Sequence, residues 1–196
     1  MIVICGDLQP VAGRQRLAAS IAGSAAHGGA VVQVVGIVPD GPEGDGYLLE
    51  LAALGVGHAA VLRTRPRSLE SADLELALRY LPDVRVVVAA GLEPGLIASV
   101  ADGAAFAEAN LVIVNSLSAE KPVDADLPTS AIVLEAPATD PDGTFAGFVA
   151  AFAGRLDSGE VPADAWEATL QTLAVDAITR DPDRRGPRHR DPAAAQ

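Results

Sequence analysis

The sequence predicts an α/β protein, a three-layer α/β/α sandwich around a mostly parallel, doubly wound sheet. Three observations support this prediction. Six strand-like runs alternate with six helical stretches along the chain, as in repeated βαβ units. Hydrophobic residues make up 49 % of the sequence but aromatic residues only 4 %, so Ala, Val, Leu and Ile have to build the core, as in sheets covered by helices on both faces. The length of 196 residues favours a single domain with a sizeable core.

The predicted strands are short apolar runs, rich in β-branched residues and bounded by glycine, proline or polar residues. They comprise residues 2–5, 31–37, 56–62, 84–90, 111–114 and 131–135. Gly29 and Pro39 bound the second of these runs. The loop, helix and strand that follow it complete a βαβ unit, whose two strands should be parallel.

The predicted helices have apolar residues on one face and end at glycine or proline. They comprise residues 14–26, 48–54, 68–80 and 95–107, a segment after 147 that ends at 156, and 161–177. Gly55 is the expected C-cap of the second helix, and Pro82 stops the third. Residues 39–46, 63–67 and 115–128 are expected to be turns or loops, and Trp166, on the apolar stripe of the last helix, is expected in the core.

The net charge of −12 excludes some classes of partner. Such an acidic surface repels phosphate backbones and anionic lipids, so neither nucleic acid nor a membrane surface is expected as a partner. No run approaches 18 apolar residues, so no membrane span is expected. The loop at 63–67 holds three arginines, which either receive an anion or form an ordinary solvated loop.

Cysteine use and the chain ends indicate the compartment. Cys5 lies in the first apolar run, which predicts a buried thiol of a cytoplasmic protein rather than a nucleophile. Met1 leads directly into that run without the basic segment of a signal peptide. The preference for Arg over Lys, with abundant Ala, Gly, Val and Asp, suggests a GC-rich bacterial genome.

Residues 1–177 should form the domain. The Arg-, Asp- and Pro-rich residues 178–196 should form a disordered tail.

A glycine and aspartate pattern extends from the second strand into the second helix. It reads Gly36-x-Val38-x-Asp40-x-x-x-Gly44-Asp45 and continues as Leu51-x-x-Leu54-Gly55-Val56. This resembles the G-x-V-G-x-D-x-x-G-D…L-x-x-x-G-V signature of the ribokinase-like (PfkB-type) carbohydrate kinases. Pro39 stands where that family has glycine, and the spacing from leucine to glycine is one residue short. The same residues also suit a plain loop and helix cap.

A second resemblance to this family lies at residues 139–147. Thr139, Thr144, Phe145 and Gly147 are in register with its D-T-T-G-A-G-D-T-F-x-G signature. In the family, the glycines leave backbone N–H groups free to hold developing phosphate charge, and the second aspartate is the general base. Here Gly143 occupies the position of the base, and Asp140 and Asp142 occupy glycine positions.

These exchanges have a physical consequence. Asp140 followed by Pro141 predicts an N-cap aspartate with proline at the first helical position. Its carboxylate would accept the N–H groups that would otherwise bind phosphate, and Asp142 would repel an incoming anion. Asp142 also lies one residue from the lost base, which makes it the candidate catalytic residue if a register shift brings it into place.

Other parts that the resemblance implies are missing. Val11 stands near the position of the aspartate that grips the sugar, and about eight residues between the first strand and the first helix leave no room for a lid. Several strands and helices expected between 114 and 131 are also absent. The prediction is therefore a truncated ribokinase-like fold without lid, which can still form an oligomer but not through a lid.

Three functions remain open. The first is a non-catalytic homologue. It would serve as a binding protein, or as a regulatory or interaction protein that contacts a protein partner. The alternative is an active ATP-dependent sugar or nucleoside kinase, a phosphotransferase with an alcohol acceptor and with Asp142 as base, for which ATP and magnesium would be the cofactors. The third is binding of a cation or polyhydroxylated ligand without chemistry. Candidate ligand-binding residues follow the predicted strands or the second signature: Asp7, Gln9, Asp40, Glu93, Thr139, Asp140, Gly143 and Thr144. The three histidines show no metal-ligand spacing, so no metal site is predicted.

Overall fold

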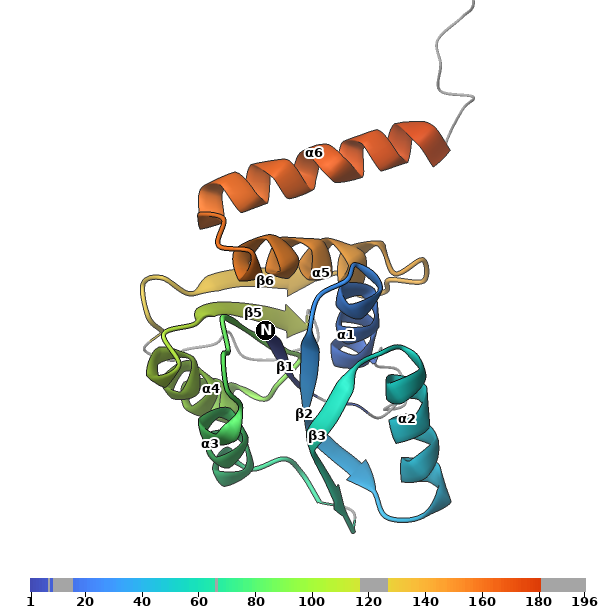
Figure 1. Ribbon diagram of the computed structural model, residues 1–196, viewed down its shortest axis with the longest axis vertical. Helices are drawn as coiled ribbons and strands as arrows, with labels where there is room; N and C mark the ends of the chain where they lie inside the picture. The colour runs from blue at the N-terminus through green and yellow to red at the C-terminus, as the bar shows by residue number, and fades with distance from the viewer. Residues whose placement is uncertain (7, 9–15, 66, 117–126, 181–196) are drawn as a thin grey trace, which may run out of the picture.

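Six strands form one sheet in the order β3-β2-β1-β4-β5-β6 (Figure 1). They are β1 (Ile2–Gly6), β2 (Val32–Pro39), β3 (Gly57–Thr64), β4 (Val86–Ala90), β5 (Asn110–Ser116) and β6 (Ile132–Ala136). Every neighbouring pair is parallel, so the predicted sheet is confirmed, and the described residues add no antiparallel strand to it. The computed structural model describes residues 1–6, 8, 16–65, 67–116 and 127–180.

Helices cover both faces of the sheet and produce the predicted three layers. One face packs against α1 (Leu17–His27), α2 (Pro42–Ala53) and α5 (Thr144–Asp157). The other face packs against α3 (Ser71–Tyr80) and α4 (Pro94–Phe106). No helix among the described residues is both long enough and apolar enough to cross a membrane.

Strand β1 shows why both faces are covered. Ile2 and Ile4 belong to the core beneath α1 and α5, whereas Val3 and Cys5 belong to the core beneath α3 and α4. Because successive side chains of a strand point to opposite faces, a strand of only apolar residues needs a helix layer on each side. The predicted burial of Cys5 is confirmed.

The last helix, α6 (Pro162–Arg180), lies outside these layers (Figure 1). Its Trp166 packs edge-on against Phe148 and Phe152 of α5, with ring centroids 5.0 and 5.6 Å away. Trp166 keeps 36 % of its surface exposed, so the expectation that it belongs to the core is wrong. The reason is that α6 packs on the outer side of α5 rather than on the sheet.

Several element boundaries differ from the prediction. Helix α2 begins at Pro42, inside the stretch expected to be a turn, because Gly41 has a φ of 97° and proline suits the first turn. Arg63 and Asn115 end up in strands β3 and β5 rather than in loops. Helix α6 continues to Arg180, and residues 181–196 lie outside the described part, so the disordered tail stays a prediction.

Gly44 allows the close approach of α2 to the end of β2. A Cβ atom at Gly44 would lie 1.9 Å from the backbone oxygen of Pro39, whereas one at Gly46 would meet nothing within 4 Å. We expect Gly44→Ala to lower the free energy of unfolding by about 1–3 kcal/mol, as overpacking does. The measurement is urea unfolding followed by circular dichroism.

Gly46→Ala, in the same helix, is the matched control. It should raise the free energy of unfolding by up to about 1 kcal/mol, because alanine favours a helix more than glycine does. Equal effects of the two substitutions would contradict a steric role for Gly44.

Candidate functional site

The order of the strands points to one crevice at the carboxyl edge of the sheet. The chain leaves β1 toward α1 on one face and leaves β4 toward α4 on the other. Open α/β sheets bind their ligands where neighbouring strands diverge in this way. In this sheet that point lies between the carboxyl ends of β1 and β4.

An apolar side chain fills part of this edge. Leu8 follows β1 and is 1 % exposed. A Cβ atom at Gly36 of β2 would lie 2.6 Å from the backbone oxygen of Gly6 and 2.9 Å from Cγ of Leu8, so Leu8 packs directly over that glycine. Gly36 and Gly44 of the first signature are therefore both required for close packing, and the described part of this edge holds an apolar contact.

Arg16, which precedes α1, is occupied by other parts of the chain. Its guanidinium donates two hydrogen bonds to Glu50 of α2, at 3.0 and 2.9 Å, and its Nε donates to the backbone oxygen of Leu8. The same guanidinium lies 5.0 Å from the ring centroid of Tyr47. A cation held in this way ties the loop after β1 to helix α2.

The N-terminus of α5 is closed by a carboxylate. Asp140 accepts hydrogen bonds from the backbone N–H groups of Phe145, at 3.0 Å to Oδ1, and Ala146, at 2.9 Å to Oδ2. The N-cap of the helix is Gly143, with a left-handed φ of 66°, and not the predicted Asp140. Glycine tolerates this φ, and the resulting turn brings Asp140 back over the first turn of the helix. Two of the N–H groups at the N-terminus of α5 are thus bonded within the chain and are not free for an anion.

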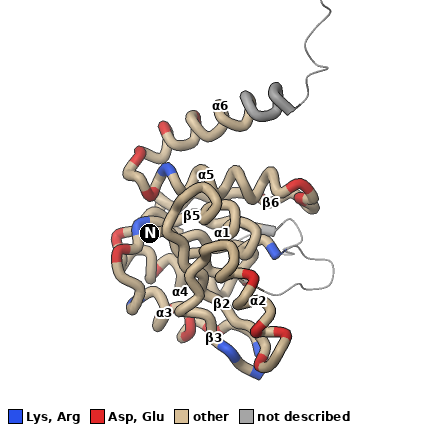
Figure 2. Tube along the Cα trace, turned by 45° about the vertical axis from the view of Figure 1, so that its right-hand side comes forward, with Lys and Arg blue, Asp and Glu red and all other residues tan. Residues whose placement is uncertain are grey.

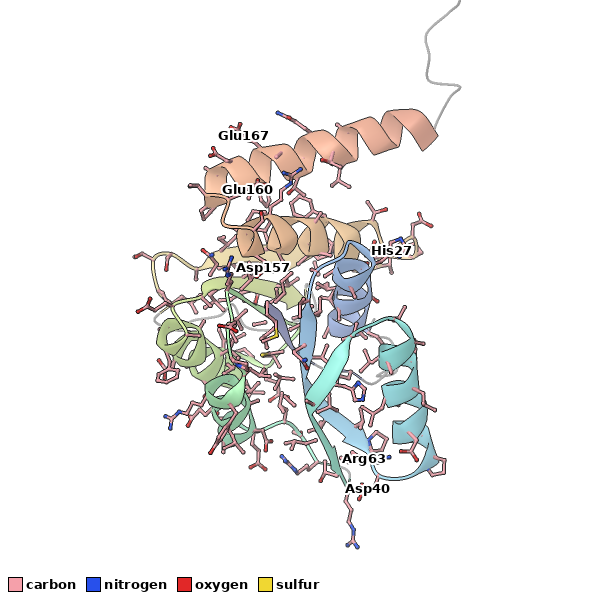
Figure 3. All side chains as sticks on the ribbon, viewed as in Figure 1. His27, Asp40, Arg63, Asp157, Glu160 and Glu167 are labelled. Carbon is pink, nitrogen blue, oxygen red and sulfur yellow. The ribbon has the colours of Figure 1, made fainter. Side chains whose placement is uncertain are left out.

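The other predicted site residues lie along the edge and do not converge on one point. Thr139, Asp142 and Thr144 are exposed around the start of α5, while Asp140 and Gly143 are half-buried there. Asp40 is exposed after β2, close to Arg63 (Figure 3). Because β2 and β6 are four strand spacings apart, Asp40 lies on the order of 19 Å along the sheet from the loop that leads into α5.

Three further residues were predicted to bind a ligand. Asp7 and Gln9 lie outside the described residues. Glu93 is exposed at the N-cap of α4, after β4. The assignment of these residues to a ligand stays a prediction.

The arginines of the loop at 63–67 are largely paired with acidic residues. Arg63 forms an ion pair with Asp45 of α2. Arg67 donates hydrogen bonds to both carboxylate oxygens of Asp73, at 2.7 and 3.0 Å, and these bonds lower the pKa of Asp73. Since two of the three cations are neutralised by different helices, the described residues do not form a converging anion site.

Two hollows lie beside α1. The larger, of about 870 Å³, runs between α1 and α5 and is lined mainly by small residues of both helices, among them Gly23, Gly147, Ala151 and Gly154. The smaller, of about 340 Å³, lies between α1 and α2 next to Arg16 and Glu50. Neither hollow includes Asp140 or Asp142.

Metal-ligand clusters and a reactive cysteine are further kinds of functional group. Among them, no group of three His, Cys, Asp or Glu side chains could hold a metal ion. Burial raises the pKa of the Cys5 thiol to about 12, so this thiol is protonated at neutral pH and is no nucleophile.

The residues that sequence reasoning missed here are Leu8 and Arg16. Leu8 is an apolar residue within the stretch GDLQPVAG, and its apolar side chain was the signal for burial. The partner of Arg16 is Glu50, which lies 34 residues away in the sequence, so the local sequence pattern does not predict this pairing.

The fold is similar to that of several solved structures, among them PfkB proteins. The protein Sa239 shares 13 % identity, with a TM-score of 0.57 over 88 % of this chain and 93 % of that chain. A PfkB protein from Polaromonas sp. JS666 shares 12 % identity, with a TM-score of 0.58 over 86 % of this chain and 92 % of that chain. No protein-family model and no curated sequence matches the chain. These likenesses establish a ribokinase-like fold, as the sequence predicted.

Asp140 should contribute to stability through its two hydrogen bonds. We expect Asp140→Ala to lower the free energy of unfolding by about 1 kcal/mol, the usual loss when a helix cap is removed. Urea unfolding measures this loss. Asp142→Ala, two residues away and exposed, is the control and should change the value by less than about 0.5 kcal/mol. If Asp142→Ala lowered the free energy of unfolding more than Asp140→Ala does, Asp142 rather than Asp140 would cap the helix.

Cys5 should be inert in the folded chain. Its raised pKa leaves about a thousandfold less thiolate than an ordinary thiol has at the same pH, and the side chain is fully buried. We expect iodoacetamide at pH 8 to leave Cys5 unmodified in the folded chain and to alkylate it after unfolding in guanidinium, as measured by mass spectrometry. Equal alkylation rates in both states would contradict burial of the thiol.

Proposed function

From the ribokinase-like fold of this chain, we propose that it is a non-catalytic homologue of carbohydrate kinases that serves as a binding or regulatory and interaction protein. The observation behind this proposal is the bonding of Asp140 to the N–H groups of Phe145 and Ala146. Phosphoryl transfer depends on donors that stabilise the charge developing on the phosphate. A carboxylate bonded to these donors removes them from that task.

Electrostatics at the same place also disfavour a phosphate. An incoming anion would have to displace a carboxylate that already satisfies two N–H groups, and it would meet the exposed Asp142 beside them. Like charges at such short range raise the free energy of the bound state. The position that the family uses for its general base holds Gly143, which has no side chain to accept a proton.

The packing of Leu8 beside the end of β1 supports the same proposal. Leu8 packs over Gly36 at the carboxyl edge, so the described part of this edge offers an apolar contact in place of a hydroxyl-binding group. Arg16, which donates a hydrogen bond to the backbone oxygen of Leu8, is already paired with Glu50. A protein with this arrangement can keep the scaffold and its surface while it no longer transfers a phosphoryl group.

Calorimetric titration with ATP and magnesium tests the proposal. We expect no binding heat from the wild-type chain, and binding in the double variant Asp140→Gly/Asp142→Ala, in which the N–H groups are freed and the second acid is removed. The reason is that the helix N-terminus then regains the anion-binding character that the aspartates mask. Asp164→Ala, in the first turn of α6, controls for a general change in charge.

A different pattern would favour the active kinase. Micromolar binding by the wild type that weakens in Asp142→Ala, together with ATP-dependent phosphorylation in a panel of sugars and nucleosides, would contradict loss of catalysis and support Asp142 as the base. A shift in melting temperature with a sugar or a divalent cation, without turnover, would support ligand binding as the retained function.

A further inference from the structure

Strand β3 is an open edge of the sheet. Among the described residues it pairs only with β2, and nothing pairs with its outer side (Figure 1). The N–H of Asp40 donates to the backbone oxygen of Thr64 at 3.0 Å, so the backbone of Thr64 faces inward. Because backbone direction alternates along a strand, the N–H and C=O groups of Val61 and Arg63 face outward. These groups can be satisfied only by water or by another strand.

The two edges of the sheet differ in ways that matter for association. Strand β6, at the other edge, has five residues, of which one is the exposed Glu135. Strand β3 has eight residues, with an uncharged run from His58 to Leu62 and no proline. Natural sheets protect their edges with short strands, charges or proline. Strand β6 is short and carries a charge, whereas the one charged residue of β3 is Arg63.

On one side of β3, helix α2 adds apolar surface. The ion pair between Asp45 and Arg63 shows that this flank of α2 faces β3, whereas Glu50, which pairs with Arg16, faces α1. Leu49 follows Asp45 by four residues and therefore lies on the same flank. It is 70 % exposed.

On the other face of the sheet, helix α3 also carries exposed apolar residues. Leu78 of α3 packs against Gly103 of α4, so this flank of α3 faces α4. Leu76 and Tyr80 are four residues apart on the side of α3 opposite Leu78, away from α4, and are 58 % and 79 % exposed. Both helix layers thus carry exposed large apolar residues on the helix nearest to the β3 end of the sheet.

We propose that this surface, β3 with Leu49, Leu76 and Tyr80, binds the same surface of a second copy of the chain. A two-fold axis perpendicular to the sheet would place the two β3 strands antiparallel in one continuous sheet, with α2 facing α2 and α3 facing α3. A single extended peptide would satisfy the backbone groups of β3 but would leave the flanking apolar side chains in water. Another three-layer edge covers the strand and both flanks together.

Charge favours the same occupant. The chain has a net charge of −12, so most of its surface repels a second copy. At this edge, Arg63 neutralises Asp45, and Arg65 adds an exposed positive charge; Figure 2 shows basic and acidic residues side by side where β3 ends and α2 begins. Such a dimer needs no lid, and it does not depend on the proposed loss of catalysis.

Sedimentation of the full-length chain over a range of concentrations tests the dimer. We expect the wild type to reach about twice its monomer mass of 19.9 kDa. Val61→Pro removes an outward N–H, which an edge strand tolerates, and should leave a folded monomer. Leu49→Lys should weaken dimerisation at least about tenfold, because the two-fold places both new charges in one interface.

Phe106→Lys is the matched control for Leu49→Lys. Phe106 is 71 % exposed at the end of α4, on the far side of α3 from β3, and its substitution should leave the dimer intact. Circular dichroism and melting temperature confirm that each variant is folded, and Leu49→Lys decides the question if Val61→Pro unfolds. A wild type that stays monomeric up to about 100 μM overturns the proposal. So does a dimer that Val61→Pro and Leu49→Lys leave unchanged.

Discussion

Burial of strand β1 on both of its faces is the constraint from which the rest of the structure follows. Ile2, Val3, Ile4 and Cys5 are all inaccessible to solvent, although their side chains point alternately to opposite sides. Only a helix layer on each face removes all four from water. The chain therefore leaves β1 toward one face and leaves its neighbour β4 toward the other, and this divergence creates the crevice where a ribokinase-like fold can hold a ligand.

At that crevice the same backbone geometry can serve two opposite purposes. The N–H groups at the start of α5 attract any anion, because they are unpaired within the helix and lie at the positive end of its dipole. In this chain the anion is the carboxylate of Asp140, which is permanently attached. A tethered carboxylate loses little entropy on binding and cannot diffuse away, so it competes strongly with a free phosphate. In this chain, an aspartate carboxylate therefore serves as the cap of α5.

The sequence predicted much of the fold and part of the site for identifiable reasons. Strand runs such as 84–90 and the glycine stop at Gly55 depend on neighbours along the chain, so their types were predicted correctly. The start of α2 was predicted too late, because the left-handed Gly41 and the approach of Gly44 to Pro39 depend on packing against β2. The closure of α5 by an aspartate was visible from the residue exchange, but the residue at its N-cap was not.

By itself, the sequence determined the alternation of strands and helices, the apolar character of both faces of the sheet, and the presence of acids where the family has glycines. All of these depend on residue type and on spacing along the chain. Tertiary structure alone decided that β4 pairs with β1, that Leu8 packs over Gly36, that Arg16 meets Glu50, and that β3 is left at an open edge. These contacts join segments that are distant in sequence, and which segments meet is settled only when the whole chain buries its apolar surface at once.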